Sequence, residues 1–140
     1  MKKGGLIMRI IYLYLLALPV FFAIDMLWIG VIAKSFYRQN LGHLLRPDVN
    51  WAAALIFYLL YIAGILIFAT LPALEKKSLQ QAVIMGALFG FFCYATYDLT
   101  NLATMKDWPV KVVVVDILWG MALTSFVAAA TFFIGKWIMQ

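Results

Sequence analysis

Three aspartates lie inside strongly apolar stretches of the sequence: Asp25, Asp98 and Asp116. A charged side chain at the centre of a membrane-spanning helix costs at least about 2.5 kcal/mol, so such residues usually have a function. Each aspartate lies five to nine residues from a lysine at the edge of its stretch, namely Lys34, Lys106 or Lys111. At about 1.5 Å per helical residue, each carboxyl group lies roughly 7–14 Å below a helix end. If consecutive helices alternate in direction, all three fall in the same half of the membrane.

Polar and aromatic residues recur at helical spacing around these aspartates. Asn101 follows Asp98 by three positions and Tyr94 precedes it by four, so the three side chains share one helix face. A tryptophan also follows each of the other two aspartates by three positions. The sequence therefore predicts a ligand-binding site made of Asp25, Asp98, Asn101, Asp116, Tyr94, Trp28 and Trp119.

Several kinds of chemistry fit such a site. Carboxylate and amide oxygens suit a hard cation, whereas zinc is disfavoured because His43 is the single histidine. Alternatively the cluster holds and passes protons, because like charges close together in a low dielectric do not all ionise. A third alternative is a cationic or hydroxylated ligand between the aromatic rings. The carboxyl groups could also pair with neighbouring bases and lock the helices together, although hydrogen bonds inside membranes average only about 0.6 kcal/mol.

No enzyme or cofactor motif accompanies the aspartates. The sequence has no GxSxG, no HExxH, no phosphate-binding loop and no dinucleotide fingerprint. Catalytic residues, metal ligands and cofactors therefore stay unassigned, and whether the protein is an enzyme stays open.

The elements that must position these residues follow from composition. The 140 residues are 66% hydrophobic and 12% charged, whereas soluble domains are nearer half apolar and a quarter charged. Four apolar stretches, at about 6–34, 51–72, 79–105 and 110–138, reach the roughly 20 residues needed to cross a bilayer as a helix. We expect an all-α, four-helix transmembrane bundle, one domain over 1–140, with a longer interfacial loop over 35–50. In the first part of this loop the first helix can extend to about Asn40, with Gly42 as its stop.

Local signals mark the ends of these helices. Asn50 or Asp48 can cap the second helix, and Pro72 is expected to end it. Ser78, with Gln81 three positions later, forms a capping-box pattern at the start of the third.

Small and aromatic residues predict how the helices meet each other and the membrane. Gly86 and Gly90 form a small-xxx-small stripe that suits close helix packing, either inside the chain or in a homodimer. Trp51 and Trp108 are expected in the aromatic belt at the membrane interface.

The basic residues predict orientation and partners. The net charge of +5 lies at the ends of apolar stretches, where lysines and arginines meet lipid headgroups, so it does not indicate nucleic-acid binding. The first stretch exceeds the usual signal-peptide core of about 7–15 residues, which favours an uncleaved helix. By the positive-inside rule both termini are expected in the cytoplasm, because their side carries one more base: Lys2, Lys3, Arg9, Lys76, Lys77 and Lys136 against Lys34, Arg38, Arg46, Lys106 and Lys111.

Motifs spread over nearly the whole chain resemble the small predicted bacterial membrane proteins of domain-of-unknown-function family 2177. They are Ala23–Ile24–Asp25 with Trp28 and Gly30, Phe36–Tyr37–Arg38 with Leu41–Gly42, Asn50–Trp51–Ala52–Ala53, Tyr94 to Ala103, and Val115–Asp116 with Trp119–Gly120. The resemblance implies a four-helix protein of the bacterial inner membrane, and it implies no established activity.

Three hypotheses follow from these residues. The leading one is a membrane protein that binds a cation or small polar ligand, with a transporter component as one form of it. The second is a membrane-embedded enzyme acting on lipids, with an aspartate as general acid or base and the loop bases holding a phosphate. The third is a structural or assembly partner. Asp98→Asn separates them, because only the third role should survive it.

Overall fold

The computed structural model describes residues 3–139, all of whose regular elements are helical. Their order is α1 (Lys3–Leu27), the π-helix η1 (Trp28–Ile32), α2 (Lys34–Leu41), α3 (Trp51–Ile65), the π-helix η2 (Leu66–Thr70), α4 (Leu71–Glu75), α5 (Leu79–Thr104) and α6 (Val110–Met139). They form four stretches long and apolar enough to span a membrane: Gly4–Ile32, Trp51–Glu75, Leu79–Thr104 and Val110–Met139. The prediction of an all-α, four-helix membrane protein is confirmed. Lys2 of the basic cluster lies outside the described residues.

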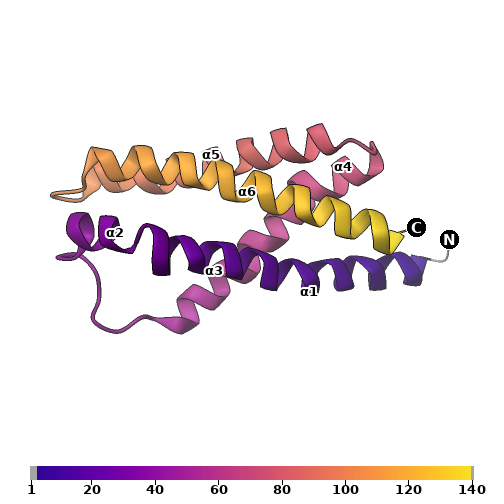
Figure 1. Ribbon diagram of the computed structural model, residues 1–140, viewed down its shortest axis with the longest axis horizontal. Helices are drawn as coiled ribbons and strands as arrows, with labels where there is room; N and C mark the ends of the chain where they lie inside the picture. Colours follow the sequence, from indigo (N-terminus) through magenta and orange to yellow (C-terminus); the bar gives the residue numbers. More distant parts are fainter. Residues whose placement is uncertain (1–2, 140) are drawn as a thin grey trace.

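The helices α5 and α6 pack along their length, α1 lies beside α6, and α3 crosses the others obliquely (Figure 1). The stripe of small residues on α5 makes the α5–α6 contact. A Cβ atom on Gly86 would come within 2.9 Å of the Thr124 carbonyl oxygen, and one on Gly90 would overlap the carbonyl of Gly120. The stripe therefore serves packing inside the chain.

The core lies between α1, the α3–η2 segment and α6. Its largest fully buried side chains include Leu13 and Phe21 from α1, Ile62 from α3 and Leu123 from α6. Two hydrogen bonds cross the core: one joins the Tyr61 and Thr124 hydroxyls at 2.8 Å, and one joins those of Thr70 and Thr131 at 2.7 Å. Large apolar side chains elsewhere face outward, as a lipid environment requires.

The segment after the first helix is helical to Leu41, close to the predicted stop at Gly42, but the helix is interrupted at Ala33. The wide turn η1 ends at Ala33, whose φ and ψ of −102° and 5° break the helix, and α2 then starts at Lys34. This short helix forms because Leu41 has an apolar site to occupy, against Trp108, Val112 and Val113. The expected loop is thus helical in its first part.

The second membrane helix also extends past its predicted end at Pro72. The π-helix η2 precedes this proline, and α4 then continues to Glu75. Pro72 lies in the first turn of α4, where a residue needs no free backbone N–H. The proline is therefore accommodated and does not end the helix.

The predicted helix starts are confirmed by their caps. The Asn50 side chain accepts a hydrogen bond from the Ala53 amide at 3.1 Å, and the Ser78 hydroxyl accepts one from the Gln81 amide at 3.2 Å. Trp108 lies in the turn between α5 and α6, where only 8% of it is exposed and its ring meets Tyr97 edge-on, so its place in the aromatic belt stays a prediction. Trp51 remains exposed.

Candidate ligand-binding cavity

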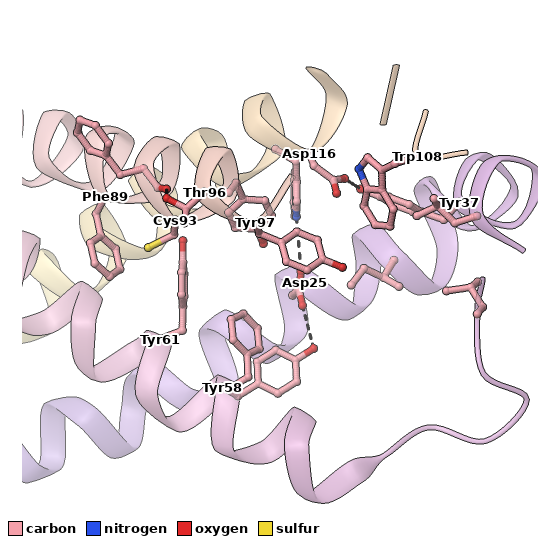
Figure 2. A pocket seen from close by; sticks show the side chains of 17 residues that line it. Asp25, Tyr37, Tyr58, Tyr61, Phe89, Cys93, Thr96, Tyr97, Trp108 and Asp116 are labelled. Carbon is pink, nitrogen blue, oxygen red and sulfur yellow. Dashed lines mark hydrogen bonds between the residues drawn. The ribbon is translucent and has the colours of Figure 1, made fainter. Parts of the chain in front are cut away.

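A cavity of about 880 Å³ lies between α3 and α5, at the end of the bundle near α2 (Figure 2). Side chains of α1, η1, α2, the loop after α2 and α6 complete its lining. Its lining is mostly aromatic and aliphatic, with two carboxyl groups. The lining residues are Asp25, Ile29, Tyr37, Leu41, Leu45, Phe57, Tyr58, Tyr61, Phe89, Phe92, Cys93, Tyr94, Thr96, Tyr97, Trp108, Asp116 and Trp119.

Asp25 contributes the first carboxyl group from the last part of α1 and is only 4% exposed. The Tyr58 hydroxyl donates to its Oδ2 atom at 2.9 Å, and the Trp119 indole donates to its Oδ1 atom at 3.5 Å. Figure 2 shows the hydrogen bond between Tyr58 and this carboxyl group as a dashed line. Tyr58 and Trp119 come from α3 and α6, so three membrane helices fix the position of Asp25.

Asp116 contributes the second carboxyl group from the first turns of α6. The Tyr37 hydroxyl donates to its Oδ1 atom and accepts a hydrogen bond from the Trp28 indole at 3.2 Å. Burial, and after it the hydrogen bond to Asp116, raises the pKa of Tyr37, so this hydroxyl stays protonated and remains a donor. The Trp28 ring stacks on Trp119 with centroids 4.3 Å apart, which connects the surroundings of the two carboxyl groups.

Asp98 lies behind the cavity wall. Its side chain is fully buried beside Asp116 and Trp108. Within residues 3–139, neither of its oxygens has a hydrogen-bond partner, and the same is true of the Trp108 indole N–H. Asp98 nevertheless lies close enough to the Trp108 indole and the Asp116 carboxyl group to interact with both, so it is buried without a well-formed hydrogen bond but is not isolated.

The seven predicted site residues therefore fall into three groups. Asp25, Asp116, Tyr94 and Trp119 line the cavity, whereas Trp28 supports it by stacking on Trp119. Asp98 and Asn101 do not line it. Among the described residues no three histidine, cysteine or acidic side chains come close enough to hold a metal ion, so the carboxyl groups do not form one cation cage.

No basic side chain lines the cavity in the described part of the chain. The hydrogen-bond partners of Asp25 and Asp116 are tyrosine and tryptophan groups. The bases expected to pair with the aspartates are all exposed: Lys34, Arg38, Arg46, Lys106 and Lys111. None of the hydrogen bonds described for Asp25 and Asp116 comes from a base, so the hypothesis that these bases lock the aspartates in place is not supported.

Four aromatic residues of the site were not predicted from the sequence: Tyr37, Tyr58, Tyr61 and Trp108. Tyr58 and Tyr61 lie three positions apart in a membrane helix, and each hydroxyl needs a partner there, which is a signal that spacing alone could have given. Tyr37 and Trp108 lie outside the four predicted helices, and only the fold brings them to the aspartates.

The sequence profile described as predicted membrane protein (DUF2177) matches residues 10–133. The chain belongs to this family. Every residue that lines the cavity falls within the matched range. No curated protein and no solved structure gives a significant match.

Proposed function

We propose that this DUF2177 protein binds a small amphipathic molecule in the cavity between α3 and α5, with the Asp25 carboxyl group receiving its polar end. The observation that carries the proposal is the position of Asp25. This carboxyl group is almost buried, lies at the wall of a largely apolar cavity, and bonds only to Tyr58 and Trp119 among the described side chains. An ionisable group inside a membrane helix is costly, and ligand binding is a common reason for it.

The cavity suits a ligand in size and in chemistry. Sites for small molecules usually measure about 300–1,000 Å³, with mostly apolar walls and a few converging polar groups. The volume of about 880 Å³ lies in this range. A carboxylate offers about four acceptor positions, of which Tyr58 and Trp119 use two, so Asp25 can still accept hydrogen bonds from a ligand.

Ligand binding at an intramembrane aspartate was the leading hypothesis from the sequence, and an amphipathic molecule is a narrower class of ligand. A transporter component in a bacterial inner membrane, with cytoplasmic termini, remains one setting in which such a site would work. Binding of a bare metal ion is less well supported, since no group of three metal-ligating side chains forms in residues 3–139. The lipid-enzyme hypothesis required bases around a phosphate, and no base lines the cavity in this range.

Native mass spectrometry on protein extracted gently from its own membrane tests the proposal. We expect a defined extra mass on the unmodified protein that is lost in Asp25→Asn. Asp107→Asn is the matched control, because Asp107 is exposed in the turn before α6 and should keep the extra mass. Bare protein in all three samples would overturn tight binding and would favour the structural-partner hypothesis.

A further inference from the structure

We propose that the polar end of the cavity's ligand is a protonated amine, so that the ligand belongs to the class of amphipathic amines. This inference rests on the proposed function and adds the ligand's charge. It comes from three features of the described residues: the charges of the lining, the aromatic rings around Asp25, and the side on which the cavity meets the lipid.

The charge of the lining is one-sided. Asp25 and Asp116 both line the cavity, Asp98 lies directly behind Asp116, and no lysine, arginine or histidine of residues 3–139 lines the cavity. Buried charges in proteins are normally paired. A ligand that carries a positive charge would stabilise the ionised form of these carboxyl groups, whereas a carboxylate or phosphate would meet acidic groups and find no base to pair with.

The hydrogen-bond donors beside the two carboxyl groups already donate to carboxyl oxygens. The Tyr58 hydroxyl and the Trp119 indole point to Asp25, and the Tyr37 hydroxyl points to Asp116. The positions left open on these carboxyl groups are acceptors, which an ammonium group with its N–H donors can fill.

Aromatic rings surround the same point. Trp119 and Tyr58 contact the Asp25 carboxyl group directly, and Tyr94 lines the cavity nearby. Trp119 is held in place by its stack on Trp28. Rings of tryptophan and tyrosine attract cations through their faces, and this attraction is strongest where water is excluded.

The apolar part of the ligand has a place toward the lipid. Phe57 on α3 and Phe92 on α5 both line the cavity, yet 44% and 63% of their surfaces are exposed. In a membrane these exposed surfaces face hydrocarbon. A ligand whose ammonium group meets Asp25 can therefore extend an alkyl chain past Phe57 and Phe92 into the bilayer.

The test compares three probes of equal chain length: dodecylamine, dodecanol and dodecanoate. The protein is placed in nanodiscs of phosphatidylcholine, whose zero net charge keeps the three probes comparable. Binding is read as slower maleimide labelling of Cys93, the chain's single cysteine, which is half-buried and lines the cavity. We expect dodecylamine to protect Cys93 at a concentration at least about tenfold lower than dodecanol, because of the charge-assisted contact, and dodecanoate to protect least.

Two variants assign the preference to the proposed contact. Asp25→Asn should bring dodecylamine to within about twofold of dodecanol, since the ion pair is lost and the apolar contacts remain. Asp107→Asn should keep the full preference. If Asp25→Asn fails to fold by circular dichroism, Trp119→Phe replaces it, and dodecylamine should then protect several-fold less well.

The outcomes separate the two proposals. Equal protection by all three probes, or stronger protection by dodecanol or dodecanoate, would overturn the amine and leave the amphipathic-ligand proposal standing. An amine preference that survives Asp25→Asn would also overturn the assignment. Absence of protection by every probe would overturn both proposals together.

Discussion

The close packing of α5 on α6 predicts that replacement by alanine affects the stability of the bundle differently at Gly90 and at Gly30. A Cβ atom added at Gly90 would overlap the Gly120 carbonyl group and lie 2.7 Å from the Thr124 hydroxyl oxygen. A Cβ atom added at Gly30 would meet nothing within 4 Å. Gly90→Ala should therefore weaken the bundle, whereas Gly30→Ala changes the same chemical group without a clash.

The expected difference in stability between the two variants follows from the cost of the clash and from the helix propensity of alanine. Forcing a methyl group into a packed interface costs about 1–3 kcal/mol, because the backbones must move apart and lose contacts along the interface. Replacing glycine by alanine inside a helix without a clash gains about 1 kcal/mol. The helix gain is common to both variants and cancels, so Gly90→Ala is expected to be about 1–3 kcal/mol less stable than Gly30→Ala.

The assay is reversible unfolding in mixed micelles, followed by circular dichroism as the fraction of denaturing detergent rises. Gly86→Ala should fall between the other two variants, because its added Cβ would lie 2.9–3.0 Å from its nearest α6 atoms. Equal stability of Gly90→Ala and Gly30→Ala would refute the α5–α6 contact described above.

Two further predictions concern the buried polar groups. Asp98→Asn should raise the free energy of unfolding by about 1–3 kcal/mol, because it removes an acidic group that is buried beside the Asp116 carboxyl group, while Asp107→Asn leaves it unchanged; a clear loss of stability in the same assay would show that the contact of Asp98 with Trp108 stabilises the fold. Tyr37→Phe should speed amide hydrogen exchange in α2 by about tenfold or more, since it removes a hydrogen bond to a carboxylate. Tyr12→Phe on the exposed face of α1 is its control, and equal exchange in both variants would show that Tyr37 does not hold α2.

The sequence was sufficient for the membrane helices, because hydropathy and the backbone's need for internal hydrogen bonds act residue by residue. Caps at Asn50 and Ser78 were predictable for the same reason, since each depends on residues three positions away. Helical spacing also predicted that Asp25 and Asp116 lie near one another in the same half of the bundle.

The remaining part of the site depends on contacts between distant residues. Tyr58 reaches Asp25 across 33 positions and Tyr37 reaches Asp116 across 79, and no local pattern encodes either pair. Asp98 shares a face with Tyr94 in sequence, yet it points behind the cavity wall because α5 packs that side against α6 and Trp108. The rotation of a helix about its axis is set by packing, which hydropathy does not determine.

The oblique course of α3 makes the cavity sensitive to the thickness of the membrane (Figure 1). The helix α5 packs on η2 and α4, the continuation of α3, and the cavity occupies the space between α5 and α3 itself. A membrane helix in a thinner bilayer increases its tilt. If the segment pivots where η2 and α4 contact α5, greater tilt of α3 would move Phe57 away from Phe92 and widen the entrance to the cavity. Lipids with shorter acyl chains should therefore ease entry to Asp25 even when headgroup and ligand stay the same.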